Sequence, residues 1–379
     1  MPNHRNISLA WEILFHDKQR LLLSLAGIAF SVLTMFVELG FFNGFNDSQV
    51  NLIDRYKDAD LVMLHKHKTN MVRMDRMEKS HLYQTLAFDE IAELIPVYEG
   101  HMRAKNPDSG LSHRISVIAF PADADPFLLE GFDRYRDLLK RTNTVLFDSR
   151  SRTIYGDVRP GMDIELNNRT FQVGGLVTLG PNFANNGYVL MSDTSWRSSR
   201  RSRHEISFGL IRLKPGSDAQ QVKQQIQSSM PNDILVMTQA ELRARDIRVF
   251  IFLAPLGIVF GIGLVVGFII GIIICYQIIF NEITDHLAQY ATLKAIGFSN
   301  WYMTGVVLQI ALLLSLTGFL PGLLGGWIIY RAIDYFSRIR MFLTFGRIGV
   351  IYLLTVVMCT IAGLLAARKV IDADPAEVF

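Results

Sequence analysis

Residues 281–303, NEITDHLAQYATLKAIGFSNWYM, form a short polar stretch between two long apolar runs. The preceding run covers residues 249–280 and the following run residues 303–330, and neither contains a charged side chain. A helix needs about 20 apolar residues to cross the hydrocarbon layer of a bilayer, which is about 30 Å thick. The stretch therefore predicts two membrane spans joined by a short polar helix, residues 281–302.

Two further apolar blocks, residues 21–45 and 348–367, are also long enough to span a membrane. Only 19% of the 379 residues are charged, whereas soluble proteins contain about a quarter. The composition therefore predicts an integral membrane protein with four transmembrane helices. Both cysteines lie inside the four apolar blocks, Cys275 in residues 249–280 and Cys359 in residues 348–367. We therefore expect no disulfide framework and no cysteine-based metal site.

Residues 46–248 have an ordinary soluble composition and predict a large α+β domain outside the membrane. Alternating residues on both sides of Asn167–Asn168 predict a β-hairpin. Strands are expected at residues 59–67, 113–121 and 208–216, and helices at residues 87–96 and 217–231, the second with Ser217 as its N-cap. We therefore expect two β-α-β-like portions, near residues 58–125 and 205–240, and a β-rich insert near residues 140–200.

The remaining segments complete the predicted domain order. Residues 1–20 have one apolar helical face, which indicates an interfacial helix or a helical extension of the first span. Residues 249–280 would form a helix on the order of 48 Å long, so part of the second span is expected to project as a stalk. Residues 331–347 would form a loop on the side of the large domain, and residues 368–379 a tail on the opposite side. Arginines in 331–347 argue mildly against placing that side outside the cytoplasm, and charge leaves the orientation open.

The sequence lacks the common motifs of enzymes. It has no phosphate-binding G-x-x-x-x-G-K-[ST], no H-E-x-x-H, no G-x-S-x-G, and no G-x-G-x-x-G after a strand. The net charge of +3 and the absence of a basic patch interleaved with aromatic residues do not indicate nucleic-acid binding. We therefore expect neither catalysis nor a metal or cofactor bound by this chain.

Glycines recur at four-residue spacing in two of the predicted spans. Such spacing produces a smooth helix face on which another helix can approach closely. The alternative is the general enrichment of glycine in membrane helices. The candidate packing residues are Gly263, Gly267 and Gly271 in the second span, and Gly318, Gly322 and Gly326 in the third.

The polar helix itself contains the candidate coupling residues. A helix fixed at both ends by membrane spans can pass a force from a soluble partner to those spans, although a passive solvated connector has the same pattern. Gly297 is well placed to end the helix, and Ser299 to cap the next one. The residues expected to face water or a partner are Glu282, Asp285, His286, Gln289, Tyr290 and Lys294. The candidate coupling residues are Thr284, His286, Gln289, Tyr290, Lys294 and Gly297.

The segment TLKAIGFS, residues 292–299, resembles the signature of the coupling helix in MacB/FtsX-like ABC transporter permeases. The longer segment 286–299 is most similar to the DevC branch, the permease of the heterocyst glycolipid exporter. Residues 9–32 resemble the N-terminal elbow and first span of this family, 161–177 its extracytoplasmic β insert, and 366–379 its C-terminal tail. One departure is that the common R-E-I-G core of the coupling helix reads AQYAT here, which weakens the transfer of single contact residues.

This resemblance implies a multi-pass protein of the inner membrane with its large domain in the periplasm. It also implies a homodimer whose subunits each bind a separate cytoplasmic ATPase, which holds ATP and Mg²⁺. The permease would transmit ATP-driven motion to its periplasmic domains and export a lipid-like substrate, such as a glycolipid, through a membrane-fusion protein and a TolC-like outer-membrane channel. Alternatives are an FtsX-like regulator of an envelope hydrolase and a lipoprotein-releasing permease.

Overall fold

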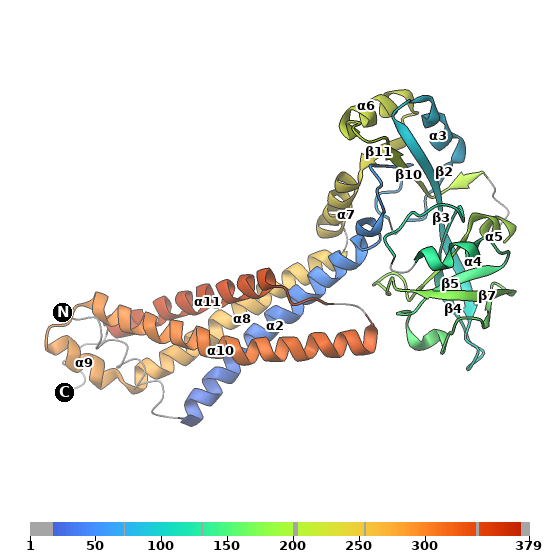
Figure 1. Cartoon of the computed structure of the whole chain (residues 1–379). Helices are drawn as coiled ribbons and strands as arrows, with labels where there is room; N and C mark the ends of the chain where they lie inside the picture. Colours follow the sequence, from blue (N-terminus) through green and yellow to red (C-terminus); the bar gives the residue numbers. More distant parts are fainter. Residues whose placement is uncertain are drawn as a thin grey trace. The chain divides into compact units, whose positions relative to one another are not determined.

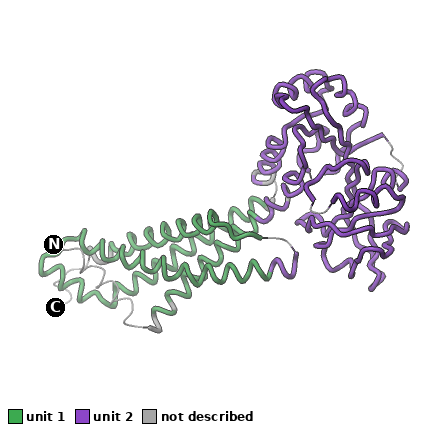
Figure 2. Tube along the Cα trace, viewed as in Figure 1, with its two compact units in different colours: residues 1–43, 255–332, 341–379 green, residues 44–254, 333–340 purple. Residues whose placement is uncertain are grey.

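The computed structural model describes residues 18–71, 73–129, 132–199, 204–253, 255–338 and 341–372. The chain forms two compact units (Figure 2). We call residues 1–43, 255–332 and 341–379 the helical unit, and residues 44–254 and 333–340 the sheet unit. The predicted interfacial helix lies almost entirely outside the described residues, as does the end of the predicted tail.

Among the residues that the structure describes, the helical unit contains four long helices and one short helix (Figure 1). The long helices are α2 (Lys18–Val50), α8 (Pro255–Asp285), α10 (Asn300–Ser337) and α11 (Phe345–Asp372), and the short one is α9 (Leu287–Ala295). Each long helix contains a segment apolar and long enough to cross a membrane: Ser24–Ser48, Gly257–Asp285, Asn300–Ser337 and Phe345–Arg368. The four predicted transmembrane helices are therefore confirmed.

The core of the helical unit is apolar and lies between the long helices. Phe36 of α2, Ile279 of α8, Ile310 of α10 and Met358 of α11 are all fully buried in it. Helix α10 contains 38 residues, which corresponds to about 57 Å of helix and exceeds the hydrocarbon thickness by a wide margin. The loop predicted at residues 331–347 is therefore too long, because α10 continues to Ser337 and α11 begins at Phe345.

The sheet unit contains a nine-stranded sheet in the order β11-β1-β10-β3-β4-β8-β5-β7-β6 and a two-stranded sheet of β2 and β9. The strands are β1 (Leu61–His65), β2 (Met77–Glu78), β3 (Ile91–Lys105), β4 (Ser112–Phe120), β5 (Thr144–Asp148), β6 (Asp163–Leu166), β7 (Arg169–Val177), β8 (Tyr188–Ser192), β9 (Glu205–Ile206), β10 (Phe208–Leu213) and β11 (Ile234–Thr238). Its helices are α3 (Lys79–Gln84), α4 (Arg136–Leu139), α5 (Asp193–Ser198), α6 (Ala219–Ser229) and α7 (Gln239–Leu253), with short 3₁₀ turns at Ile53–Arg55, Thr85–Ala87, Phe132–Tyr135 and Thr153–Tyr155. A mixed α/β domain is thus confirmed.

The two predicted β-α-β-like portions interleave in one sheet. Strand β1 of the first portion pairs antiparallel with both β10 and β11 of the second. The long strand β3 then joins the sheet's two halves, because its first part pairs with β10 and its second part with β4. Strands β5 to β8 of the predicted insert continue the same sheet.

The hairpin predicted at Asn167–Asn168 is confirmed. Strands β6 and β7 pair antiparallel up to the Leu166–Arg169 pair, and both asparagines have positive φ, 50° and 63°. Two consecutive positive φ angles give a type I′ turn, whose twist matches that of the flanking strands.

The helix predicted at residues 87–96 is wrong, because the chain enters strand β3 at Ile91. Alanine and glutamate favour a helix in isolation, but here pairing with β10 places Ile95 and Val97 in the core with no exposed area. Tertiary pairing therefore overrides the local preference.

The helix predicted at residues 217–231 is confirmed as α6, but its N-cap is Asp218 and not Ser217. The Asp218 carboxylate accepts hydrogen bonds from the backbone N–H groups of Gln220 and Gln221, at 2.8 and 3.3 Å. A side-chain oxygen at this position satisfies donors that the first helical turn leaves unpaired.

Candidate functional site

The glycines of α8 face helix α2. A Cβ atom added to Gly263 would lie 2.5 Å from the carboxyl group of Glu38, and one on Gly267 would lie 3.3 Å from Thr34. A Cβ on Gly271 would meet Ser31 of α2 and also Met358 of α11. This face therefore lies against two other helices at distances that only glycine permits without adjustment.

The glycines of α10 face the same helix. A Cβ atom would lie 2.6 Å from Ile28 at Gly318, 2.6 Å from Val32 at Gly322 and 3.0 Å from Phe36 at Gly326. Helix α2 therefore packs between two glycine faces, one from each of its neighbours. By contrast, a Cβ atom added to Gly261 of α8 or to Gly305 of α10 would meet no atom of the described residues within 4 Å, so these two glycines lie outside the packed faces.

Helix α9 is fixed at its C-terminal end by a regular motif. Gly297 has a φ of +101°, the backbone N–H of Phe298 donates to the Leu293 carbonyl at 3.1 Å, and that of Gly297 donates to the Lys294 carbonyl at 3.0 Å. These two bonds form a Schellman motif, in which glycine is favoured because the conformation is left-handed. Ser299 then caps α10 by accepting from the Tyr302 N–H at 3.3 Å, so both predicted helix boundaries are confirmed.

One face of α9 is embedded in the core of the helical unit. Tyr290 is 3% exposed and Ala291 is fully buried, in the same apolar cluster as Met303 and Ile283. The prediction that Tyr290 faces water or a partner is therefore wrong. Burial raises the pKa of Tyr290 to about 12, and its hydroxyl has no hydrogen-bond partner among the described residues.

The other predicted coupling residues are distributed over the remaining surface. Thr284, Gln289 and Gly297 are exposed, whereas His286 and Lys294 are half-buried. The exposed face also includes Thr292 and Ile296, which sequence reasoning did not select. Their spacing from Gln289, three and seven residues, is the signal that could have identified them, because such residues share one helical face. We call Gln289, Thr292 and Ile296 the α9 outer face.

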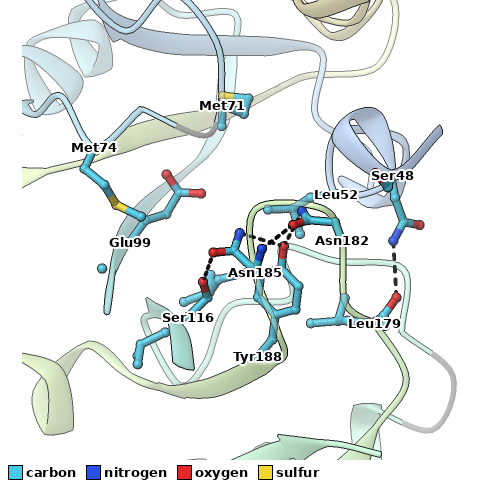
Figure 3. A pocket seen from close by; sticks show the side chains of 15 residues that line it. Ser48, Leu52, Met71, Met74, Glu99, Ser116, Leu179, Asn182, Asn185 and Tyr188 are labelled. Atoms are coloured by element: carbon cyan, nitrogen blue, oxygen red, sulfur yellow. Dashed lines mark hydrogen bonds between the residues drawn. The ribbon is translucent and has the colours of Figure 1, made fainter. Parts of the chain in front are cut away.

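The sheet unit contains a pocket of about 610 Å³, including its open mouth. Figure 3 shows Glu99 beside Met71 and Met74, with Tyr188 and its amide partners further along the wall. The Tyr188 hydroxyl accepts from the amides of Asn182 and Asn185, at 2.9 and 3.2 Å. The other lining residues include Ser48 at the end of α2 and Asn51, Leu52, Leu179 and Gly180. The pocket is thus bounded by the continuation of a membrane helix and by the loop after β7.

Glu99 is the charged residue among the described residues that line this pocket, and its partner is the buried Lys68. The Nζ of Lys68 lies 2.8 Å from the Glu99 carboxylate, and the two side chains are 0% and 8% exposed. Lys68 also donates to the Arg73 carbonyl at 2.5 Å. The pair is therefore electrically neutral and well satisfied in spite of its burial. No group of three or more His, Cys, Asp or Glu that could hold a metal ion occurs among the residues that the structure describes.

A second buried acid, Asp246, lies on α7. It is 4% exposed and accepts a hydrogen bond from the Met71 N–H at 2.8 Å, whereas its other oxygen has no hydrogen-bond partner among the described residues. Burial raises the pKa of the Asp246 carboxyl from 3.8 to about 6, although Lys68 and Arg245 act in the opposite direction.

The Asp246 pKa predicts a specific pH dependence of stability. A folded-state pKa above the unfolded value means that the folded state binds the proton more tightly, so the contribution of Asp246 to stability is greatest below about pH 4 and falls as the pH rises to about 6. A shift of this size corresponds to about 3 kcal/mol. We expect Asp246→Asn to remove this component, measured as the difference between wild-type and variant unfolding free energies from pH 4 to pH 7.5. A difference that does not change with pH would contradict the assignment.

Two family models match this chain. Residues 21–229 match the MacB-like periplasmic core domain, and residues 261–375 match the FtsX-like permease C-terminal domain. The first match alone covers more than half of the chain, and its limits include most of α2 and most of the sheet unit. The chain belongs to the MacB/FtsX-like family of ABC transporter permeases. This is a permease subunit of an ABC-type system, and its sheet unit is the extracytoplasmic domain.

Solved structures similar to this permease include a periplasmic region and an extracellular domain of two transporters. The periplasmic region of MacB from Actinobacillus actinomycetemcomitans is 8% identical, with a TM-score of 0.37, and the match covers 50% of the permease and 92% of that chain. The extracellular domain of the noncanonic ABC-type transporter YknZ from Gram-positive bacteria is 9% identical, with a TM-score of 0.33 and coverage of 47% and 99%. A domain of a putative permease protein from Porphyromonas gingivalis is 14% identical, with a TM-score of 0.33 and coverage of 48% and 87%. No curated protein matches the permease significantly in sequence.

Proposed function

We propose that this permease is the membrane subunit of an exporter that is driven by a separate cytoplasmic ATPase, which docks on α9. The observation that carries the proposal is the anchoring of α9. Its inner face, with Tyr290 and Ala291, is buried in the helical core, and the Schellman motif fixes its end. A helix held in this way would transmit a force from a docked ATPase to α8 and α10 instead of bending.

We further propose that the permease acts as a homodimer in the inner membrane, together with a membrane-fusion protein and an outer-membrane channel. ATP and Mg²⁺ would be bound by the partner ATPase. A lipid-like molecule is the proposed substrate, and a glycolipid is the first to test, because the coupling-helix segment resembles the DevC branch. The sheet unit would move in response to the ATPase and drive the substrate outward.

The α9 outer face provides the test of ATPase docking. We expect Thr292→Arg to reduce the amount of copurified ATPase at least tenfold, because a long cationic side chain would occupy the centre of this exposed face. The Thr292 hydroxyl donates to the Ala288 carbonyl within its own helix, at 2.8 Å, so the fold should persist. The measurement is ATPase per permease after purification from cells that contain the neighbouring genes.

Two controls accompany this variant. Thr292→Ser keeps the hydroxyl and should bind the ATPase normally, and Gln224→Arg places the same charge on an exposed position of α6. Wild-type ATPase binding by Thr292→Arg would show that docking lies elsewhere. Wild-type permease that copurifies with an envelope hydrolase and exports no lipid would favour the FtsX-like regulator.

A further inference from the structure

The last turn of α10 belongs to the sheet unit and not to the helical unit. Residues 333–340 group with the sheet unit by their contacts, although α10 begins at Asn300 in the helical unit. Arg338 ends the helix with a φ of +58°, and its backbone N–H still donates to the Asp334 carbonyl at 3.0 Å. The third membrane helix is therefore continuous with a segment that the sheet unit holds.

Arg150, in the loop after β5, makes the principal contacts to this segment. Its guanidinium forms an ion pair with the Asp334 carboxylate and also donates to the Arg338 carbonyl at 3.1 Å. In return, the Arg338 guanidinium donates to the Ser149 carbonyl at 3.5 Å. The Asp334 and Arg150 side chains are 37% and 24% exposed. We call these four residues the Arg150 clasp.

The position of Arg150 is set by a buried acid beside it. Asp148 has no exposed area and accepts from the backbone N–H groups of Arg150, Leu179 and Gly180, at 3.2, 2.9 and 3.1 Å. These bonds join the loop after β5 to the loop after β7. They hold the backbone on which Arg150 sits, and the planar guanidinium loses less side-chain entropy per hydrogen bond than a lysine ammonium would.

The loop after β7 also holds the continuation of α2. The Asn51 amide donates to the Leu179 carbonyl at 3.2 Å, and the Arg55 guanidinium donates to the Thr178 carbonyl at 2.7 Å. The same pair of loops thus contacts the chain directly after the first membrane helix and the end of the third. Asp148 and the three backbone N–H groups that it binds connect these two contacts.

We propose that Arg150 is the coupling residue through which the third membrane helix and the extracytoplasmic domain move together. This inference rests on the proposed function, because it assigns a mechanical role to a contact in an ATP-driven permease. A Lys at position 150 would keep the charge but lack the planar fork that reaches both the Asp334 carboxylate and the Arg338 carbonyl. We therefore expect the Arg150→Lys variant to retain only part of the coupling between α10 and the extracytoplasmic domain.

The first experiment tests whether the clasp holds α10. Hydrogen–deuterium exchange is measured at residues 333–338 in the full-length permease in lipid nanodiscs. We expect Arg150→Ala and Asp334→Ala to raise exchange in this turn at least fivefold, and the charge swap Arg150→Asp with Asp334→Arg to restore part of the protection. Arg159→Ala is the matched control, because the Arg159 guanidinium pairs with Asp157, two residues away in the same insert. Unchanged exchange in Arg150→Ala would overturn the proposal, whatever the permease exports.

The second experiment tests coupling. Permease copurified with its ATPase is treated with Mg-ATP and vanadate, and exchange is followed at residues 44–55 and 178–185. We expect a nucleotide-dependent change in wild type, and in Arg159→Ala, that falls at least threefold in Arg150→Ala while ATPase binding stays constant.

The outcomes separate the two proposals. A full nucleotide response in Arg150→Ala would overturn the role of Arg150 and leave the proposed function intact. A wild-type permease that binds no ATPase would contradict the proposed function, and the first experiment would still decide whether the clasp holds α10. A wild-type complex that binds ATPase without any nucleotide response would contradict both.

Discussion

Replacing Gly322 by leucine is expected to prevent stable folding of the helical unit. A Cβ atom at this position would lie 2.6 Å from Val32 and 3.0 Å from the backbone carbonyl oxygen of Ala29. Val32 is fully buried, and a backbone atom cannot move aside as a side-chain end can. Helices α2 and α10 would have to separate along their contact, at a cost of about 3 kcal/mol, the upper end of the usual range for overpacking.

The measurement is the yield and monodispersity of detergent-solubilised permease on size-exclusion chromatography. Gly305→Leu is the matched control on the same helix, because no atom of the described residues lies within 4 Å of its added Cβ, and it should elute as the wild type does. Normal yield and elution of Gly322→Leu would show that the α10 glycines reflect composition and not packing. Equal damage from both variants would show that the loss of glycine itself, rather than the contact with α2, is responsible.

Replacing Lys68 by methionine is expected to destabilise the sheet unit by about 3–5 kcal/mol, because it leaves the buried Glu99 carboxylate without its counter-charge. Lys68 is fully buried and lies 2.8 Å from Glu99. The double variant Lys68→Met with Glu99→Gln removes both charges and should recover most of the stability. Replacing a whole buried pair is often nearly neutral, whereas removing one partner is costly.

Hydrogen exchange of the core strands β3 and β4 in the full-length permease reports this stability. The control is Lys105→Met, because Lys105 and Glu165 form an exposed pair at 3.2 Å with side chains 48% and 38% exposed. That substitution should change stability by less than about 1 kcal/mol. If Lys68→Met were as stable as the wild type, or if the double variant were no better than the single one, burial of the pair would not be the dominant effect.

The effects of the Asp246 and Lys68 variants on stability are coupled, because both residues lie in one buried region of the sheet unit. Lys68, Glu99 and Asp246 influence one another electrostatically, so their effects are not expected to add. Asp246 lies on α7, which precedes the second membrane helix, and Met71, to which it is bonded, lines the pocket. Stability of the extracytoplasmic domain is therefore tied to charged groups beside the pocket.

Sequence reasoning predicted the membrane helices because the signal is one of length and composition. A run of about 20 apolar residues has no stable place in water, whatever its neighbours are. Local backbone signals were equally informative. The Asn167–Asn168 turn, and the end of α9 at Gly297, depend on φ angles that only a few residue types adopt easily.

Tertiary contacts decided what local patterns could not. Residues 91–96 read as helix by propensity, yet they form the first part of β3 because strand β10, far away in the sequence, pairs with them. Tyr290 read as exposed because α9 is polar overall, yet α9 turns this residue toward the core formed with Ile283 and Met303. Neither outcome can be read from a window of neighbouring residues.

The amino-acid sequence by itself determined the four spans, the place of the large domain between the first two, the polar helix between the second and third, and the glycine spacing on α8 and α10. Each depends on transfer of apolar groups from water or on local backbone geometry, which nearby residues set. Only the tertiary structure decided that both glycine faces meet α2, that Lys68 and Glu99 pair across 31 residues, and that Arg150 holds the end of α10 across 184. Those contacts join residues distant in sequence, so they form only when the whole chain packs, and no window of neighbouring residues contains both partners.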